Sequence, residues 1–416
     1  MDRHVDGPMP VASDLHTNGH GPASALLSRL VELASRPLDE AEALPGAMFY
    51  DPDLYELEVE RIFRKEWLYV ARVEELPKAG DYVCVEVAGE PIMVVRGADG
   101  QIRALSRVCL HKYADVLGDE AMPCGNVERF LCPYHSWSYG LDGNLTGAPF
   151  MRDSKLFQRE NDTYRLPEYR VAIWQGFVFV NFDPDATELA PRLTEVEEVL
   201  GGYNLADWRI VDRIDWGETP VNWKLVMDNG RECYHHQGTH KHSLEFTWPT
   251  RLVETETTDS REWYYQRIMA SPEGAGGHEE EFDLTPLATS RPAPGLSAYQ
   301  RSHLLLIGIY PTFFMVPGPD LTVVFRYFPT GPESHRMDIG LLAHESHLDD
   351  PDFPAAKDAV RELFRQVQEE DSRQILAIQG TVRSEVARRG RALSTLERPS
   401  WQFQRYLAHR LTGADV

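Results

Sequence analysis

The spacing of apolar residues changes along the chain and separates helical parts from strand-like parts. Apolar side chains recur at helical intervals from Ala23 to Ala34 and again over 53–65. Short runs rich in β-branched residues follow, separated by Gly and Asp turns, at 82–87, 91–95 and 102–105. These runs predict a small all-β domain, and the apolar run over 174–182 is predicted to be its closing strand.

The second half of the chain shows a longer alternation. The stretch from 261 to 347 alternates as a large antiparallel sheet would, with strands predicted over 302–310, 321–328 and 336–341. Apolar residues at helical spacing then predict a long helix over 353–383. The sequence therefore predicts an α+β protein, in which an all-β domain precedes a domain whose antiparallel sheet is flanked by helices.

The length of 416 residues permits two or three domains. We predict a disordered tail at 1–22, because this segment is polar and rich in Gly, Pro and His. Helices over 23–66 are expected to pack on the second domain. The all-β domain is expected at 67–185, where an Asp-Pro-Asp segment forms a linker, and the second domain at 186–416.

The charge of the chain argues against two classes of partner. Its formal net charge of -23 would be repelled by nucleic acid and by anionic membrane surfaces. No run approaches the roughly 18 apolar residues of a membrane-spanning helix, and the N-terminal segment does not resemble a signal peptide. We therefore expect a soluble, cytoplasmic protein with no nucleic-acid or membrane partner.

Two Cys-His pairs, Cys109/His111 and Cys132/His135, give the strongest chemical signal. Two thiolates and two imidazoles suit tetrahedral zinc, or a [2Fe–2S] cluster with both Cys on one iron and both His on the other. In zinc fingers each loop usually contributes like ligands, whereas here each loop contributes one Cys and one His. The mixed loops favour a Rieske cluster. The three other cysteines are few and odd in number, so they do not form a disulfide framework.

A second group of candidate ligands lies further along the chain. His235 and His240, with an acidic residue nearby, suggest the 2-His-1-carboxylate site of non-haem iron, which leaves positions open for O2 and substrate. An undistorted helix would not point residues five apart in one direction, so we expect the helix to bend or end near Gly238. His236 and His242 compete as ligands on residue type alone, and a surface cluster of histidines would show the same pattern.

Both stretches resemble a known family. The segment CPYHSWSYGLDG with its upstream CLH, and the segment from Asn222 to His240 with its NWK, DN and ECYH, resemble the Rieske non-haem iron oxygenases, the ring-hydroxylating dioxygenase α subunits. The likeness covers most of the chain. Two departures are a longer loop between His111 and Cys132, and His-Lys-Tyr-Ala where His-Arg-Gly-Ala is commoner.

The resemblance implies how the first site is built. Cys109, His111, Cys132 and His135 would bind the [2Fe–2S] cluster. Glu232 matches the carboxylate that, in the family, links a cluster His to an iron His of the neighbouring subunit. The cluster of one subunit would therefore serve the iron of the next.

The resemblance also implies the ligands of a mononuclear Fe(II). His235 and His240 would supply the two imidazoles. The third ligand would be Asp371 in the long predicted helix, with Glu369 and Glu370 as alternatives.

By the same resemblance the chain is a terminal oxygenase. It would use O2 and electrons from a separate ferredoxin or flavin reductase to hydroxylate, oxidatively demethylate or dihydroxylate a small organic substrate, and it would form a homotrimer. The sequence has no GxGxxG dinucleotide motif, which fits a separate electron donor. The alternatives are a Rieske-type electron-transfer protein without oxygenase activity and a zinc-stabilised binding protein.

Three segments show a likeness to the betaine-type amine oxygenase branch: ECYH, Tyr310-Pro311-Thr312, and the region from Glu397 to Trp401. An aromatic cage would suit a quaternary amine through cation–π attraction. Aromatic acids and natural-product scaffolds stay open as substrates, and so does the presence of a β subunit.

Overall fold

The computed structural model describes residues 22–118, 122–157, 162–255, 258, 260–271 and 292–416. The tail predicted over 1–22 lies outside these ranges, except that Pro22 begins helix α1 (Pro22–Ala34). Within the described ranges, no helix has the length and apolar content needed to cross a membrane.

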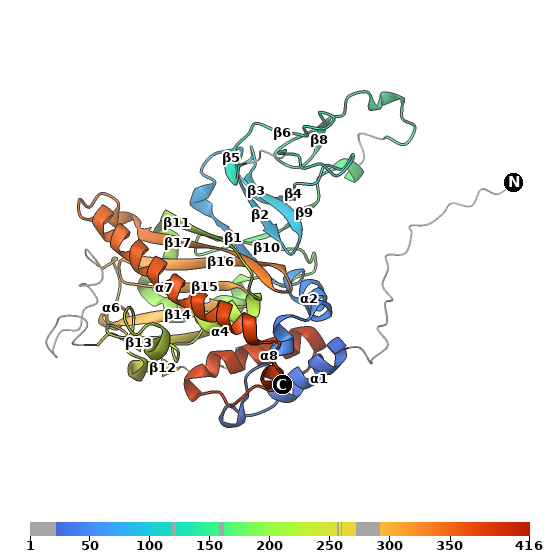
Figure 1. Ribbon diagram of the computed structural model, residues 1–416. Helices are drawn as coiled ribbons and strands as arrows, with labels where there is room; N and C mark the ends of the chain where they lie inside the picture. The colour runs from blue at the N-terminus through green and yellow to red at the C-terminus, as the bar shows by residue number, and fades with distance from the viewer. Residues whose placement is uncertain (1–21, 119–121, 158–161, 256–257, 259, 272–291) are drawn as a thin grey trace.

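The first domain is built from two antiparallel sheets. The larger has the strand order β1-β10-β9-β4-β3-β2-β5, and the smaller is β6-β7-β8. In Figure 1 the small sheet lies at the end of the domain far from helices α4 and α7. The strands are β1 (Leu68–Arg72), β2 (Asp81–Val87), β3 (Glu90–Arg96), β4 (Ile102–Ser106), β5 (Cys124–Asn126), β6 (Phe130–Leu131), β7 (Ser138–Tyr139), β8 (Leu145–Gly147), β9 (Glu168–Trp174) and β10 (Phe177–Asn181).

The strand predicted over 174–182 is present as β10 over Phe177–Asn181, but the predicted start at Trp174 is wrong. The chain instead makes a hairpin, in which β9 ends at Trp174 and β10 begins at Phe177. Gln175 and Gly176 form the two-residue turn with φ values of 50° and 80°. Positive φ at both turn residues matches the right-handed twist of the strands, and glycine tolerates it without strain. The aromatic residues on both sides of the turn hid it in the apolar pattern.

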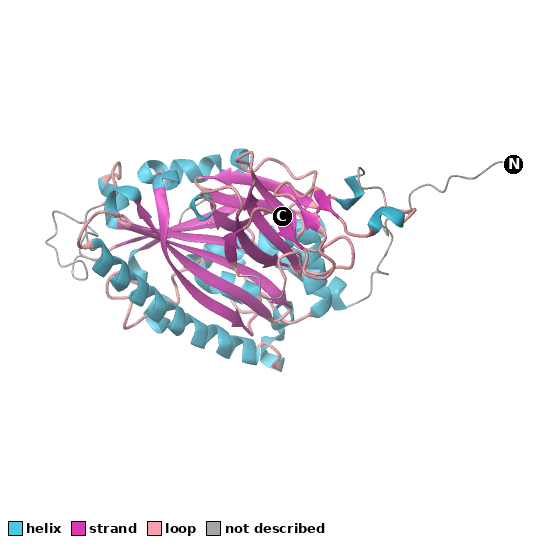
Figure 2. Ribbon diagram, turned by 90° about the horizontal axis from the view of Figure 1, so that it is seen from above, coloured by secondary structure: helices cyan, strands magenta, loops and turns pink. Residues whose placement is uncertain are grey.

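The second domain contains one seven-stranded antiparallel sheet in the order β11-β17-β16-β15-β14-β13-β12. Helix α7 (Phe353–Thr381) lies across one face of this sheet, and the strands form the interior in the view of Figure 2. This arrangement confirms the predicted α+β class. The strands are β11 (Trp208–Thr219), β12 (Val253–Thr255), β13 (Trp263–Met269), β14 (His303–Ile309), β15 (Phe313–Pro317), β16 (Leu321–Gly331) and β17 (Ser334–His344).

Shorter helices surround the second sheet. The N-terminal helix α1 packs on the last helix of the chain, and the indole Nε1 of Trp401 donates to the carbonyl of Arg36 at 2.8 Å. The remaining helices are α2 (Pro52–Glu58), which continues as a π-helical turn over Val59–Phe63, α3 (Thr194–Leu200), α4 (Trp223–Gly230), α5 (His236–Thr239), α6 (Ala298–Ser302) and α8 (Arg398–Thr412).

The two domains share a buried junction. Arg72 on β1 is fully buried and donates to the carbonyl oxygens of Trp208 at 2.7 Å and Leu205 at 3.1 Å, next to β11. On the same strand, the ring of Tyr69 packs edge-on against Phe313 of the second sheet, with 5.3 Å between ring centroids. Buried polar and aromatic contacts of this kind fix how the two domains are oriented.

A buried ion pair ties the N-terminal helices to α4. Glu58, at the end of α2, accepts hydrogen bonds from Lys224 Nζ at 2.6 Å and from Trp223 Nε1 at 2.7 Å. The side chains of Glu58 and Lys224 are 0% and 2% exposed, so neither charge is hydrated. Burial lowers the pKa of Lys224 despite its acidic partner. The lysine therefore depends on Glu58 to keep its charge.

Replacing Glu58 by Ala is expected to reduce the free energy of unfolding by about 3–5 kcal/mol, because it leaves a buried lysine without its partner. Glu60→Ala is the matched control, since Glu60 is exposed on the next helical turn. This control should change stability by less than about 0.5 kcal/mol. Chemical denaturation followed by circular dichroism measures both. Equal losses in the two variants would mean that the ion pair does not stabilise the junction.

Candidate iron and cluster sites

His235 and His240 flank a helix of only four residues, α5. His235 stands at its N-cap and His240 at its C-cap, where the backbone leaves the helical region with φ of -100° and ψ of 27°. The helix therefore ends one residue after Gly238, close to the position expected from the sequence. This short helix brings together two side chains that five residues of regular helix would point apart.

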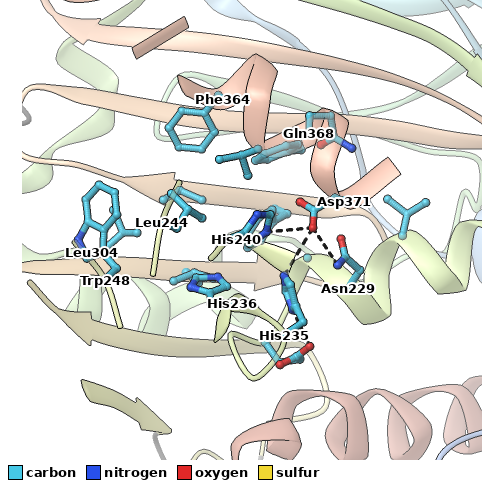
Figure 3. A pocket seen from close by; sticks show the side chains of 18 of the residues that line it. Asn229, His235, His236, His240, Leu244, Trp248, Leu304, Phe364, Gln368 and Asp371 are labelled. Carbon is cyan, nitrogen blue, oxygen red and sulfur yellow. Dashed lines mark hydrogen bonds and ion pairs between the residues drawn. The ribbon is translucent and has the colours of Figure 1, made fainter. Parts of the chain in front are cut away.

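Asp371 on α7 faces both imidazoles. Its Oδ1 lies 3.0 Å from Nε2 of His240 and 3.5 Å from Nε2 of His235, and it accepts a hydrogen bond from Asn229 Nδ2 at 3.1 Å. Figure 3 shows these four side chains converging from α4, α5 and α7. Ligands at right angles on one ion lie about 3 Å apart when the metal–ligand bonds are about 2.1 Å. The donor atoms therefore fit a 2-His-1-carboxylate metal site.

The far nitrogen of each imidazole is held by a second carboxylate. His235 Nδ1 lies 2.8 Å from Oε1 of Glu232, and His240 Nδ1 lies 2.8 Å from Oε2 of Glu370. Ser243 also donates to Glu370 at 2.5 Å. A carboxylate on Nδ1 fixes the ring and leaves Nε2 free for a metal. Glu370 thus supports His240 from the side opposite Asp371.

The charges at this site favour a bound cation. Burial opposes ionisation of Asp371, but the hydrogen bond and charge of His240 outweigh burial and lower the pKa of its carboxyl group. Burial also opposes protonation of His240, yet Asp371 and Glu370 raise its pKa. Asp371 is therefore ionised at neutral pH, and a divalent cation would replace the proton that His240 otherwise shares with it.

The two competing histidines differ from this pair. His242 is exposed, whereas His236 is 4% exposed and its ring lies 5.2 Å from that of His240. A ligand nitrogen of His236 comes within 4.8 Å of those of His235 and His240. Burial and the neighbouring imidazoles lower the pKa of His236 to about 3. Within the described residues, no carboxylate holds its Nδ1.

The two Cys-His loops have the same backbone pattern. The amide of Cys109 donates to the carbonyl of Ala114 and the amide of Cys132 to that of Trp137, both at 2.8 Å. The amides of Tyr113 and Ser136 donate back to the two cysteine carbonyls at 3.0 Å. Tyr113 and Ser136 each lie four residues after a cysteine and have φ values of 63° and 57°. The loops are therefore related by approximate two-fold symmetry, which suits a cluster held between them.

The side chains between the loops also fit a [2Fe–2S] cluster. The rings of His111 and His135 are 4.6 Å apart, and His111 stacks on Trp137. Both cysteines are buried, and His111 Nδ1 is buried without a hydrogen-bond partner in the described residues. A buried nitrogen of this kind needs a partner, and an iron of the cluster would supply it.

Tyr139 contacts the same site. Burial strongly raises the pKa of its phenol, so the hydroxyl keeps its proton. It accepts a hydrogen bond from the amide of Leu110 at 3.2 Å and lies 3.4 Å from Sγ of Cys109. A cysteine that binds a cluster is a thiolate and can only accept, so the phenol would then donate to the sulfur. A hydrogen bond to a ligand sulfur stabilises negative charge on the cluster.

The iron-side residues open into a pocket between α4, α7 and the second sheet. His235, His240 and Asp371 form one wall, and most other lining residues are apolar. A second pocket shares Trp248, Leu304, Val316 and Phe364 with the first. Figure 3 shows Trp248, Leu304 and Phe364 on the side away from Asn229.

Two family models match this chain. Residues 66–169 match the Rieske [2Fe–2S] domain, and residues 192–413 match the catalytic domain of the ring-hydroxylating alpha subunit. The chain belongs to the ring-hydroxylating α subunit family. The resemblance predicted from the sequence is thereby confirmed, and so are the two cofactors of the family, a [2Fe–2S] cluster and non-haem iron. The first motif of this α subunit belongs to a [2Fe–2S] domain rather than to a zinc site.

Several curated relatives are oxygenase subunits of betaine-type enzymes. The glycine betaine monooxygenase oxygenase subunit of Pseudomonas aeruginosa is 31% identical over 226 residues, which cover 54% of this α subunit and 50% of that protein. The carnitine monooxygenase oxygenase subunit of Acinetobacter pittii is 30% identical over 325 residues, covering 76% and 80%. The chain thus spans about half the length of the first of these relatives and most of the second.

Solved structures agree on the fold. A quaternary ammonium Rieske monooxygenase is 26% identical with a TM-score of 0.75, and the match covers 91% of this α subunit and 98% of that chain. Naphthalene 1,2-dioxygenase from Rhodococcus sp. has a TM-score of 0.76 at 20% identity, covering 94% and 98%. The second likeness concerns the fold alone.

Sequence reasoning did not predict the contacts that three residues make with the predicted ligands. Asn229 donates to Asp371, Tyr139 contacts Cys109, and Glu370 lies against Nδ1 of His240. Asn229 stands in the DN pair quoted from the sequence, so its position beside the ECYH segment was a usable signal. The role of Glu370 had no sequence signal, because it depends on how α7 is rotated against α5.

Replacing His111 by Ala is expected to abolish the visible absorption of the cluster, because losing one imidazole opens an iron to solvent. His242→Ala is the matched control, since this histidine is exposed and outside both sites. Absorption spectra and acid-labile sulfide of the two purified variants provide the measurement. An unchanged spectrum in folded His111→Ala would contradict the ligand assignment.

Proposed function

We propose that this α subunit is the terminal oxygenase of a multicomponent enzyme. The observation that supports this proposal most is that one chain joins a Rieske domain to a second, buried 2-His-1-carboxylate site that opens into an apolar cavity. An electron-transfer protein without oxygenase activity would have no use for the second site or its cavity. The activity of its relatives as monooxygenase oxygenase subunits supports the same function.

In this proposal Cys109, His111, Cys132 and His135 bind the [2Fe–2S] cluster. When bound, the cluster supplies single electrons and the non-haem iron activates O2. The protein contributes the environment of both. Buried cysteines and the contact between Tyr139 Oη and Cys109 Sγ would set the polarity around the cluster.

His235, His240 and Asp371 are proposed to hold the iron. Glu232 and Glu370 orient the two rings through Nδ1, so that both Nε2 atoms face Asp371. The largely apolar pocket beside them would hold the substrate next to these three residues.

We propose monooxygenation, either as hydroxylation or as oxidative demethylation, because that is what the named relatives have in common. One C–H bond of the substrate becomes C–OH, and the second oxygen atom leaves as water. Two electrons and two protons complete the balance, and the electrons come singly from a ferredoxin or flavin reductase. Demethylation follows when the hydroxylated carbon is an N-methyl group that is lost as formaldehyde.

A homotrimer is proposed because each chain carries exposed aromatic residues at two separate places. Tyr113 and Tyr134, beside the cluster loops, are 83% and 61% exposed. Tyr234 and Phe246, beside the iron site, are 53% and 64% exposed. Exposed apolar side chains of this size are typical of contact surfaces. Head-to-tail packing of three chains would join each cluster end to the iron side of the next.

Within that trimer we propose that Glu232 bonds His235 of its own chain and His135 of the partner subunit.

A cytoplasmic location is also proposed, since thiolate ligands and the cysteines that are free in the described structure fit a reducing compartment.

Turnover with isotopically labelled O2 tests the proposal. The iron-loaded protein would be incubated with a surrogate ferredoxin and reductase, NADH, ¹⁸O2 and a panel of L-carnitine, glycine betaine, anthranilate and neutral bicyclic ketones. The expected result is at least one product that carries one ¹⁸O atom and forms only when the reductase is present. Reduction of the cluster without any labelled product from the panel would contradict the oxygenase assignment and favour the electron-transfer alternative.

A further inference from the structure

A short turn between α4 and α5 carries two residues of the iron site. This turn begins after Gly230, the last residue of α4, and ends before α5 begins at His236. It holds Glu232 and His235, whose side chains bond each other at 2.8 Å. The turn belongs to no helix or strand, so the directions of these two side chains depend on the contacts that fix its backbone.

Arg231, the first residue of this turn, is clamped by aromatic rings. It stands at the C-cap of α4 and is 0% exposed. Its guanidinium carbon lies 3.5 Å from the ring centre of Phe403, 5.6 Å from that of Tyr264 and 6.0 Å from that of Tyr310. The rings come from α8, from β13 and from the residue after β14, and all three are buried. Aromatic faces attract a cation, so the rings hold the charged end of Arg231.

Stability alone does not account for this buried charge. Nε, Nη1 and Nη2 of Arg231 have no hydrogen-bond partner among the described residues. Contact with aromatic faces recovers only part of the hydration that a buried guanidinium loses. Replacing a buried ion by an apolar side chain of similar size is often neutral or stabilising. A buried charge of this kind therefore calls for a role other than holding the fold together.

The clamp joins the three segments that resemble the betaine-type branch. Arg231 directly precedes ECYH, Tyr310 begins Tyr310-Pro311-Thr312, and Phe403 lies on α8 just beyond the region 397–401. An aromatic cage suits a cation, and here the rings surround a cation of the chain itself. None of the three rings lines the pocket beside the iron ligands. These segments therefore meet behind the iron site, at the turn that carries Glu232.

We propose that Arg231 is a positioning residue, whose guanidinium is clamped by the three rings and fixes the turn so that Glu232 stays bonded to Nδ1 of His235. This inference rests on the proposed function, in which His235 binds iron and Glu232 connects the two centres. Arg231 acts through the turn. When the clamp is lost, Glu232 leaves the imidazole, and the ring no longer keeps its orientation toward the metal.

Arg231→Met tests the proposal, because it keeps a long apolar side chain among the rings and removes the charge. Its affinity for Fe(II) should fall about tenfold, the lower end of the range for losing a group that supports a ligand. Its unfolding midpoint should not fall, since the lost charge was buried. Arg231→Lys keeps the charge and should bind Fe(II) within about threefold of the wild type. Equilibrium dialysis without O2 and chemical denaturation of the full chain provide the two measurements.

Phe403→Leu removes the ring nearest to the guanidinium and should weaken Fe(II) binding as much as Arg231→Met does. The double variant should be no weaker than the weaker single variant, because both changes break the same contact. Arg336→Met is the matched control, since Arg336 is exposed on β17 and pairs with Asp215 at the surface. This control should bind Fe(II) like the wild type.

Several results would overturn the proposal. Wild-type Fe(II) affinity in Arg231→Met would mean that the clamp does not hold the turn, and equal losses in the Lys and Met variants would mean that the charge plays no part. Additive losses in the double variant would mean that Phe403 does not clamp Arg231. A lower unfolding midpoint of Arg231→Met would assign the residue to packing. Failure of the oxygenase assignment is distinct from all of these, because the wild-type protein would then bind no iron beyond its cluster.

Discussion

Replacing Asp371 by Ala is expected to remove the mononuclear iron and all turnover while leaving the red cluster intact. The variant keeps two imidazoles but loses the only carboxylate within 3.5 Å of both Nε2 atoms among the described residues. Removing a group that merely supports a ligand weakens metal binding about 10- to 100-fold, so losing a ligand should cost more than about 100-fold. Iron titration followed by metal analysis measures the loss of iron. Asp371→Asn tests whether a side chain of the same shape but without the charge still binds iron.

Two neighbouring acids on α7 serve as comparisons. Glu369→Ala should retain iron, because this side chain pairs with Arg365 on the outer face of the helix. Glu370→Ala should bind iron about 10- to 100-fold more weakly, because His240 loses the carboxylate on its Nδ1. If Asp371→Ala retains iron and activity while Glu370→Ala loses both, the third ligand is Glu370.

Replacing Glu232 by Gln is expected to lower product formation about 10- to 100-fold with both metals still bound. The amide keeps the shape of the side chain but removes the charge that holds His235 Nδ1 and, in the proposed trimer, reaches His135 of the partner subunit. Reduction of the cluster by the surrogate reductase should keep its wild-type rate, because that step does not involve Glu232. Product formation, iron content and bleaching of the visible band give the three readouts.

Glu198→Gln is the control for this variant, since it removes one charge from an exposed position on α3. It should match the wild type in all three readouts. A Glu232→Gln enzyme with wild-type turnover would mean that Glu232 does not connect the two centres. Loss of iron from Glu232→Gln would mean that the role of Glu232 is only structural, which is to hold His235.

The sequence was most informative where spacing alone determines geometry. The C-x-H and C-x2-H pairs predicted two facing loops with mixed ligands, and the structure has them with matching hydrogen bonds. It did not predict the left-handed backbone at Tyr113 and Ser136, because neither is glycine. These conformations are held by the hydrogen bonds of the loops themselves, and residue type carries no sign of them.

The iron site could be predicted only in part for a similar reason. His235 and His240 are close in sequence, and the end of α5 near Gly238 follows from their spacing. Glu370 and Asp371 are adjacent on one helix, so about 100° of rotation separates their directions. Which of them faces the imidazoles depends on the packing of α7 against α5, and this is a tertiary contact that no local pattern encodes.

The central claim, that one chain carries both a Rieske cluster and a separate catalytic iron, is tested most directly by metal and sulfide analysis. The protein would be reconstituted with Fe(II) without oxygen, desalted, and assayed for iron, zinc, acid-labile sulfide and visible absorption. The predicted result is a red-brown protein with about three iron ions and about two sulfides per chain. Two irons and two sulfides per chain would mean that the protein binds no catalytic iron and is an electron carrier. A colourless protein with zinc and no sulfide would contradict the account altogether.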